Sequence, residues 1–168
     1  MRLSFYICDT SYMDYLRSYD YRVPQVDKGS TARKRPLVGI VFEIEGSKFY
    51  APLSSPKVKH LTMKNSRDFI KIDGGKLGVI NLNNMVPVLD SCATEVDLVS
   101  YPIIDKSDLD YVNLLKNQLT WCNSNKEAIK AKAAVLYKLI QCESGNDNFR
   151  IRCCDFGLLI EKSKEYVY

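Results

Sequence analysis

The sequence predicts an α+β protein, and three observations indicate that class. Up to about residue 104, β-rich runs follow one another over turns too short for helical crossovers, so the strands are expected to pair mainly antiparallel. Beyond that point apolar residues recur every three or four positions, as in amphipathic helices. With 168 residues, 46% of them apolar, the chain can bury one ordinary core. We therefore expect a single domain over residues 1–168, β-rich at 1–104 and helical at 105–168.

A short strand and a helix are expected first. The run LSFYIC at 3–8 is apolar and aromatic, which favours a strand. A helix follows behind a capping Asp9 or Thr10. Three of its residues recur at helical spacing: Tyr12, Leu16 and Tyr19. The polar segment 21–35 closes in three consecutive cations, and its length predicts a loop that is either functional or disordered.

The clearest β-hairpin in the sequence lies at 36–53. Its two runs, PLVGIVFEIEG and SKFYAPL, meet at Glu45-Gly46-Ser47, where glycine supplies the permissive turn conformation. Pro52 cannot donate a ladder hydrogen bond, so the second strand is expected to lie at a sheet edge or to end there. Shorter strands are expected within RDFIKI, LGVINL and MVPVL, joined by Gly-Gly and Asn-Asn turns, which gives about six strands.

Three helices are expected in the second part of the chain. The first begins near Ser107, and one apolar face runs along it: Leu109, Val112, Leu115, Leu119 and Cys122. Ser124 with Glu127 three positions on is a capping-box signature that opens the second. Its apolar face is Ile129, Ala133, Leu136 and Ile140. The last covers DFGLLIEKSKEY behind a capping Asp155.

Positive charge is concentrated between Lys28 and Arg67. This stretch holds nine basic side chains against Glu43 and Glu45, a balance of +7, whereas the whole chain is only +4. The concentration indicates an anionic partner such as nucleic acid or phosphate, although a solvated basic face is the alternative.

The six cysteines indicate reduced, mostly buried thiols. None falls in a CxxC pair, one histidine cannot complete the usual zinc sets, and the adjacent Cys153 and Cys154 cannot easily staple a fold. We expect no metal and no cofactor. The first residues lack the apolar core of a signal peptide, and no stretch reaches membrane-spanning length. A cytoplasmic protein is expected.

Several kinds of catalytic site are absent from the sequence. A nuclease with two catalytic histidines is excluded because His60 is the only histidine. A Ser-His-Asp triad would need His60 in a sequence without a nucleophile elbow. Two-metal phosphodiester chemistry requires several converging carboxylates, and the basic region has almost none. No Walker loop or dinucleotide fingerprint occurs.

The segment APLSSPKVKH at 51–60 offers the remaining candidate chemistry. Cations and hydroxyls can stabilise charge on a phosphoryl group in transfer, and in RNA the neighbouring 2′-hydroxyl can itself attack the phosphate. Such an enzyme mainly has to hold the in-line geometry. On these residues alone, an ordinary turn at Ser54-Ser55-Pro56 with a solvated Lys57 remains the favoured alternative.

Four segments in order resemble one known family. They are FYICDTSYMDYLRSYDYRVP, RPLVGIVFEIEGSKFYAPLSSPK, LGVINLNNMVPV and DFGLLIEKSKEY. Together they resemble the endoribonuclease toxins of type III toxin–antitoxin systems, the ToxN/AbiQ/CptN group. The resemblance implies a highly twisted, mainly antiparallel sheet with packed helices, similar to the MazF and Kid toxins.

The same resemblance implies an activity and partners. Members of the group cut cellular or phage RNA without metal and leave a 2′,3′-cyclic phosphate. A small repeat-derived RNA, usually a pseudoknot that the toxin itself processes, inhibits them in a cyclic toxin–RNA assembly. Such pairs act in bacteria as growth inhibitors and as abortive-infection systems against phage.

The resemblance also implies the site residues. The hydroxyl pair and lysine of the family fall on Ser54, Ser55 and Lys57, and a basic residue before the second strand falls on Arg35, with Lys34 as competitor. The tyrosine that accompanies this basic residue in the family has no counterpart between Tyr21 and Phe42. The expected RNA contacts are Lys28, Arg33, Lys59, His60, Lys64, Arg67 and Lys71.

Two other functions stay open at this point. The basic segment would equally suit a non-catalytic cytoplasmic RNA-binding module, which would bind a discrete small RNA with a steep salt dependence. A protein-interaction domain with an acidic partner is the third hypothesis.

Overall fold

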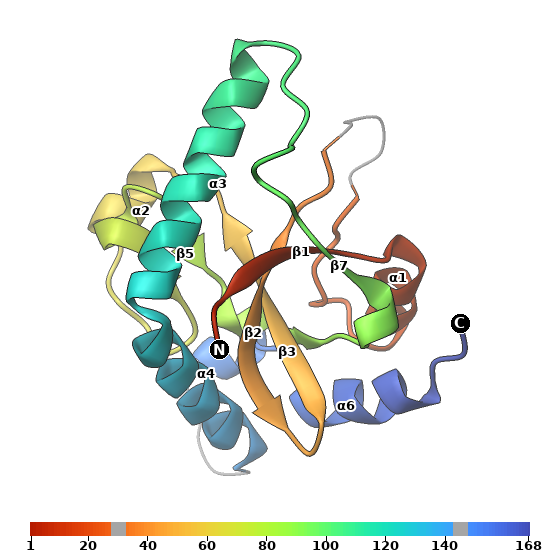
Figure 1. Cartoon of the computed structure of the whole chain (residues 1–168). Helices are drawn as coiled ribbons and strands as arrows, with labels where there is room; N and C mark the ends of the chain where they lie inside the picture. The colour runs from red at the N-terminus through yellow and green to blue at the C-terminus, as the bar shows by residue number, and fades with distance from the viewer. Residues whose placement is uncertain (28–32, 143–147) are drawn as a thin grey trace.

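A computed structural model describes residues 1–27, 33–142 and 148–168. In this part of the chain a seven-stranded sheet forms the centre of the molecule, with helices around it (Figure 1). The strands are β1 (Ser4–Cys8), β2 (Leu37–Ile44), β3 (Ser47–Ser54), β4 (Ile70–Lys71), β5 (Val79–Ile80), β6 (Val86–Pro87) and β7 (Ala93–Glu95). Their order is β4-β5-β3-β2-β1-β7, with β6 also paired to β3, and every one of these pairings is antiparallel. The predicted α+β class and antiparallel sheet are confirmed.

The predicted hairpin is the longest pairing in the sheet. Ile44 lies opposite Ser47, so the turn consists of Glu45 and Gly46, which have φ angles of 48° and 78°. Two positive φ angles match the right-handed twist of the paired strands, and glycine adopts such an angle without a steric penalty.

The expectation drawn from Pro52 was wrong, because β3 is an interior strand that continues to Ser54. On the side away from β2, β6 pairs with Phe49 and Tyr50, and β5 pairs with Leu53 and Ser54. Pro52 therefore lies at the change from one neighbour to the next, where its missing N–H interrupts no ladder. Its carbonyl accepts the Asn81 N–H at 2.9 Å.

The strands after β3 are shorter than predicted, and β7 was not predicted. Each keeps only two or three paired residues because short 3-10 turns interrupt the chain. These turns are η1 (Ile72–Gly75), η2 (Leu82–Asn84) and η3 (Asp90–Cys92).

Six helices cover the sheet. They are α1 (Thr10–Tyr19), α2 (Val58–Thr62), α3 (Lys106–Ser124), α4 (Lys126–Gln141), α5 (Asn148–Arg152) and α6 (Phe156–Glu165), all within the described residues. Asp9 caps α1 by accepting the N–H groups of Ser11 and Tyr12, and Asp155 caps α6 through Leu158 N–H. The predicted helices are confirmed, whereas the five-residue helices α2 and α5 were not predicted.

The predicted capping box at Ser124 and Glu127 was wrong. Ser124 is the last residue of α3, and Asn125 is both the end of α3 and the start of α4. The Asn125 side chain donates to the Trp121 carbonyl at 2.9 Å, so it closes the first helix instead of capping the second. The two helices thus follow each other with no loop between them.

The helices pack around one buried cluster that takes side chains from Leu3 to Leu159. In Figure 1, α3 and α4 lie to the left of the β2–β3 hairpin and α1 lies to its right. Two residues expected on buried faces are exposed instead, Tyr19 at 46% and Leu109 at 44%. Tyr19 is the last residue of α1, and Leu109 belongs to the first turn of α3, which projects beyond the sheet.

All six cysteines are free, and only Cys142 is exposed. Burial raises the pKa of the Cys8 and Cys122 thiols to about 12, so neither carries charge at neutral pH. Among the described residues no helix is both long and apolar enough to span a membrane.

Candidate active site

A cleft of about 320 Å³ lies between the start of β2 and the end of β3. Its walls come from the segment before β2, the last residues of β3 and the η2 turn. Six polar side chains line it: Arg22, Gln25, Arg35, Ser54, Asn81 and Asn84. No carboxylate occurs among the lining residues that the structure describes.

Strand register brings Arg35 and Ser54 to this cleft. Leu37 lies opposite Pro52 in the β2–β3 pairing. Arg35 precedes Leu37 by two residues and Ser54 follows Pro52 by two, and both residues line the cleft beyond this last pair. The Arg35 N–H donates to the Val26 carbonyl at 3.0 Å, which fixes the backbone just before β2. Lys34 is exposed and does not line the cleft.

Ser54 is the last residue of β3, and its backbone is tightly held. It pairs with Val79 of β5. A Cβ atom on Gly78 would lie only 2.0 Å from the Ser54 carbonyl oxygen, and Gly78 has a φ of +99°. Only glycine allows this approach and this conformation. The Ser54 hydroxyl accepts a hydrogen bond from the Asn81 side-chain amide at 2.8 Å.

Ser55 and Lys57 follow Ser54 in the chain, just after the end of β3. Both are exposed, and neither belongs to the lining of the cleft. Among the described residues, no group accepts a hydrogen bond from the Lys57 ammonium and no carboxylate pairs with it. The ammonium is therefore available to a ligand.

His60 lies inside the protein and not on the surface. It is 2% exposed, and its Nδ1 accepts the Lys57 N–H at 3.2 Å. Burial lowers the pKa of the imidazole, and the charges of Lys59 and Lys57 lower it further, so the ring is neutral at neutral pH. The side chain that was expected to contact RNA is therefore not exposed in this structure. His60 instead holds the first turn of α2.

The other expected RNA contacts are distributed over the surface. Lys59, Lys64 and Arg67 are exposed, whereas Lys71 is half-buried and lines a separate pocket of about 490 Å³ with Trp121. Lys28 lies outside the described residues.

Arg33 differs from these residues because it has partners on α3. Its guanidinium pairs with the Asp108 carboxylate and lies 4.9 Å from the centre of the Tyr111 ring. Burial raises the pKa of Tyr111 to about 12 overall, although the Arg33 and Arg35 charges act in the other direction. The sequence showed no tyrosine near this basic segment, and the tertiary fold supplies one from a distant helix.

Four polar residues of the cleft were not predicted: Arg22, Gln25, Asn81 and Asn84. The Arg22 guanidinium binds both carboxylate oxygens of Asp20 at 2.8 and 3.1 Å, and the Asn84 amide donates to the Arg22 carbonyl at 2.8 Å. For the two asparagines the available signal was the polar NLNN sequence, in which Asn81 was assigned to the strand run LGVINL and Asn84 to the Asn-Asn turn.

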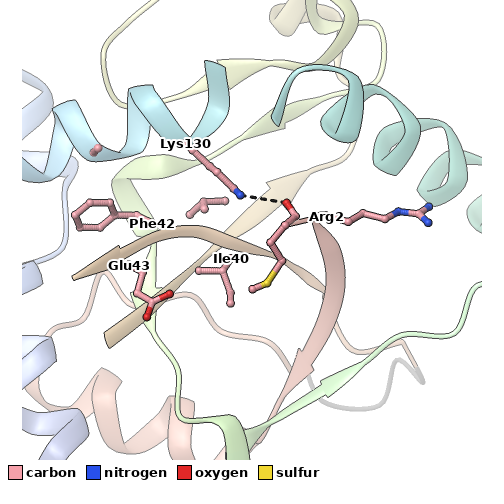
Figure 2. A pocket seen from close by; sticks show the side chains of 8 residues that line it. Arg2, Ile40, Phe42, Glu43 and Lys130 are labelled. Atoms are coloured by element: carbon pink, nitrogen blue, oxygen red, sulfur yellow. Dashed lines mark hydrogen bonds between the residues drawn. The ribbon is translucent and has the colours of Figure 1, made fainter. Parts of the chain in front are cut away.

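A second pocket of about 320 Å³ lies against α4 (Figure 2). Ile40 and Phe42 of β2 contribute apolar side chains, and the Lys130 ammonium donates to the Met1 carbonyl at 3.2 Å. This pocket shares no residue with the cleft and contains no hydroxyl or amide side chain among its described residues. No group of three or more histidine, cysteine, aspartate or glutamate side chains that could hold a metal ion occurs in the described part of the chain.

The cleft thus combines two arginines, of which Arg22 is paired with Asp20, with a hydroxyl and amide groups, and Lys57 follows three residues after Ser54. Guanidinium groups bind phosphate oxygens with two parallel hydrogen bonds, and hydroxyls and ammonium groups add further donors. The arrangement suits the binding of a phosphodiester and the stabilisation of negative charge that develops on it.

Comparison with known proteins places the chain among bacterial toxins. The family model described as "Toxin ToxN, type III toxin-antitoxin system" matches residues 4–164. The chain is 30% identical over 170 residues to the endoribonuclease ToxN of Pectobacterium atrosepticum, covering 98% of this chain and 94% of that protein.

Two solved structures have the same fold. One, from work on selective toxin inhibition by a non-coding RNA pseudoknot in type III systems, superposes with a TM-score of 0.82 at 28% identity and covers 99% of this chain and 98% of its own. The other, from work on a processed non-coding RNA that regulates a bacterial antiviral system, has a TM-score of 0.80 at 29% identity and covers 100% of both chains.

Proposed function

This chain belongs to the ToxN family of type III toxin–antitoxin toxins and is an endoribonuclease, and we propose that it cuts RNA without a metal ion at the cleft beside Ser54. The observation that carries this proposal is that Arg35, just before β2, and Ser54, at the end of β3, line one cleft whose described lining has no carboxylate. In this proposal residues 1–168 act as one domain.

The reaction that fits these groups is an internal transfer within RNA. The 2′-hydroxyl oxygen bonds to the adjacent phosphorus as its proton passes to water, and the bond from phosphorus to the 5′-oxygen breaks as that oxygen takes up a proton from water. The products are a 2′,3′-cyclic phosphate and a 5′-hydroxyl end. No outside nucleophile is needed, so the protein has to align the three reacting atoms and stabilise the extra negative charge.

Each residue has a role in this scheme. Arg35 binds the non-bridging phosphate oxygens with its guanidinium, and Lys57 neutralises the same charge. Ser55 positions the phosphate or the attacking hydroxyl, and Ser54 supports it. Arginine keeps its proton near neutral pH, so Arg35 binds charge and does not transfer a proton.

The inhibitor in this proposal is a small structured RNA. The relative with a TM-score of 0.82 is inhibited by a non-coding RNA pseudoknot. Exposed Lys59, Lys64 and Arg67 have no carboxylate partner among the described residues and suit phosphate contacts. Lys71 and, from its residue type alone, Lys28 are further candidates in this proposal. The family resemblance further supports a repeat-derived antitoxin, processed by the toxin in a cyclic assembly, and a role in growth inhibition and defence against phage.

The proposal is tested with purified protein and RNA in excess EDTA. We expect cleavage to persist and the products to carry 2′,3′-cyclic phosphate ends, which mass spectrometry identifies. Lys57→Ala should lower the cleavage rate at least about 100-fold, because one charged donor to the transition state is lost. Lys138→Ala, an exposed lysine on α4, is the matched control and should cleave normally.

Loss of all cleavage in EDTA would disprove the metal-free mechanism. If the protein bound a discrete RNA but never cleaved it, the non-catalytic RNA-binding module would be the better description. An RNA-free protein without cleavage would favour the protein-interaction domain.

A further inference from the structure

We propose that Asn81 is a positioning residue that fixes the Ser54 hydroxyl as a hydrogen-bond donor to the scissile phosphate. The inference rests on the proposed cleavage function of the cleft and assigns a role to a residue that the reaction scheme above leaves out. It also decides what Ser54 does, because a serine hydroxyl can either donate or accept.

The chemistry of the two side chains determines which one donates the hydrogen bond between them. The Asn81 amide nitrogen lies 2.8 Å from the Ser54 oxygen and can only donate, so the serine oxygen is the acceptor. Among the described residues no other group hydrogen bonds to this hydroxyl. Its single proton is therefore available, and the open direction is the cleft that both residues line.

Both residues are held by the backbone, so the contact is built in before RNA binds. The Asn81 N–H donates to the Pro52 carbonyl at 2.9 Å, and the Asn84 N–H donates to the Asn81 carbonyl at 3.2 Å. Ser54 is held by its pairing with Val79 and by the close approach of Gly78. A donor oriented in advance stabilises transition-state charge without reorganisation during the reaction.

A consequence is that Ser54 is not the proton acceptor for the attacking 2′-hydroxyl. An accepting lone pair of its oxygen is occupied by Asn81, and the neighbouring Arg35 charge disfavours a protonated serine. The hydroxyl instead donates to a non-bridging phosphate oxygen, where negative charge increases as the 2′-oxygen attacks.

The test is a double-mutant cycle on the cleavage rate with Asn81→Asp and Ser54→Ala. An ionised aspartate is nearly the same size but can only accept, so it would draw the serine proton away from the phosphate. Asn81→Asp alone should lower the rate about 10- to 100-fold, and Ser54→Ala alone about 100-fold. With Ser54 already replaced, Asn81→Asp should cost less than about 3-fold, because most of its effect acts through the missing hydroxyl.

A second readout is the pH profile of Asn81→Asp. Below the ordinary aspartate pKa of about 4 the new carboxyl is protonated and can donate to Ser54 as the amide does. The ratio of wild-type to Asn81→Asp rate should therefore shrink as pH falls through about 4. Asn84→Asp places the same charge in the same cleft without contacting the Ser54 hydroxyl. This substitution should therefore lower the cleavage rate by the same factor in the wild-type protein and in Ser54→Ala.

The outcomes separate the inference from the proposed function. Equal losses for Asn81→Asp with and without the Ser54 hydroxyl would overturn the positioning role while cleavage at the cleft still stood. A wild-type protein that does not cleave RNA would overturn both. Circular dichroism melting shows whether each variant folds. If Asn81→Asp does not fold, Asn81→Ala replaces it in the cycle, and additive rate losses for Asn81→Ala and Ser54→Ala would overturn the positioning role.

Discussion

Arg35 and Lys34 are neighbours with the same charge, and the sequence alone could not say which one faces the site. The structure shows that Arg35 lines the cleft and that Lys34 does not. Arg35 precedes β2 by two residues, and its N–H is held by the Val26 carbonyl at 3.0 Å. The residue types were thus predictable, whereas their placement depended on a contact with a distant segment.

We predict that Arg35→Ala lowers the rate of RNA cleavage about 100-fold or more, because the guanidinium binds the phosphate. Lys34→Ala should cause a much smaller loss, limited to the weaker attraction of RNA. Single-turnover cleavage of one defined RNA by both variants measures the difference. A larger loss for Lys34→Ala would assign the role to Lys34 instead.

His60 shows that the sequence does not indicate whether a single residue is buried. A histidine among lysines was expected to meet RNA, but its ring is buried and accepts the Lys57 N–H. Nothing in the local pattern distinguished these possibilities, since α2 has only five residues and no extended apolar face. The backbone of Gly75 packs closely against His60, since a Cβ atom added to Gly75 would lie 2.3 Å from the His60 carbonyl oxygen.

The hairpin β2–β3 and the helices α1, α3, α4 and α6 were predictable because each is long enough to repeat its hydrophobic pattern several times. The strands β4 to β7 have two or three residues each, too few for any period to appear. They pair only because the rest of the fold brings β5 and β6 beside β3, β4 beside β5, and β7 beside β1. This is why the cleft wall formed by η2 was missed, although the strand that carries Ser54 was not.

Gly78 offers a test of how β5 and its preceding turn support the site. Gly78→Ala places a methyl group where the Ser54 carbonyl lies and forces a residue with a side chain to adopt a φ of +99°. We predict a loss of about 1–3 kcal/mol in the free energy of unfolding. Cleavage should fall strongly as well, because the end of β3 must move. Urea unfolding and a cleavage assay measure the two effects.

Gly46→Ala is the matched control. Gly46 also has a positive φ, but nothing lies within 4 Å of the added methyl group. It should cost about 1 kcal/mol of unfolding free energy and leave cleavage intact. Normal cleavage by Gly78→Ala would mean that the position of Ser54 does not depend on this contact.

Two buried carboxylates join the C-terminal segment to the earlier part of the chain. Asp68 is 1% exposed and accepts from the Arg152 guanidinium at 2.9 and 3.0 Å. Asp20 accepts the Asp155 N–H at 2.7 Å while it also binds Arg22. Through these contacts α5 and the start of α6 are fixed beside the wall of the cleft.

The pKa of Asp68 predicts a dependence of stability on pH. Burial alone raises this pKa, but the hydrogen bonds from Arg152 and Ser66 outweigh it and the net pKa is lowered. A carboxylate with a lowered folded pKa stabilises the fold fully above its unfolded value of about 4 and loses that contribution as pH falls through the folded value. Acid should therefore weaken this link.

Asp68→Asn should lower the unfolding free energy by about 2 kcal/mol at pH 7, because a charged acceptor of the Arg152 hydrogen bonds is lost. The difference from wild type should shrink as pH falls below about 4. Urea unfolding at stepwise lower pH gives both values. Asp14→Asn, an exposed aspartate on α1, should change stability little at either pH, and a constant difference for Asp68→Asn would contradict the argument.

The sequence by itself determined the α+β class, the hairpin, the main helices and the segment that carries the candidate chemistry. These follow from local periodicity, capping and turn residues, all of which act over a few neighbouring positions. The tertiary structure alone decided the composition of the cleft, where Arg35, Ser54 and Asn81 meet. It also decided that His60 is buried. Such contacts depend on strand register and on packing between distant segments, which no local pattern records.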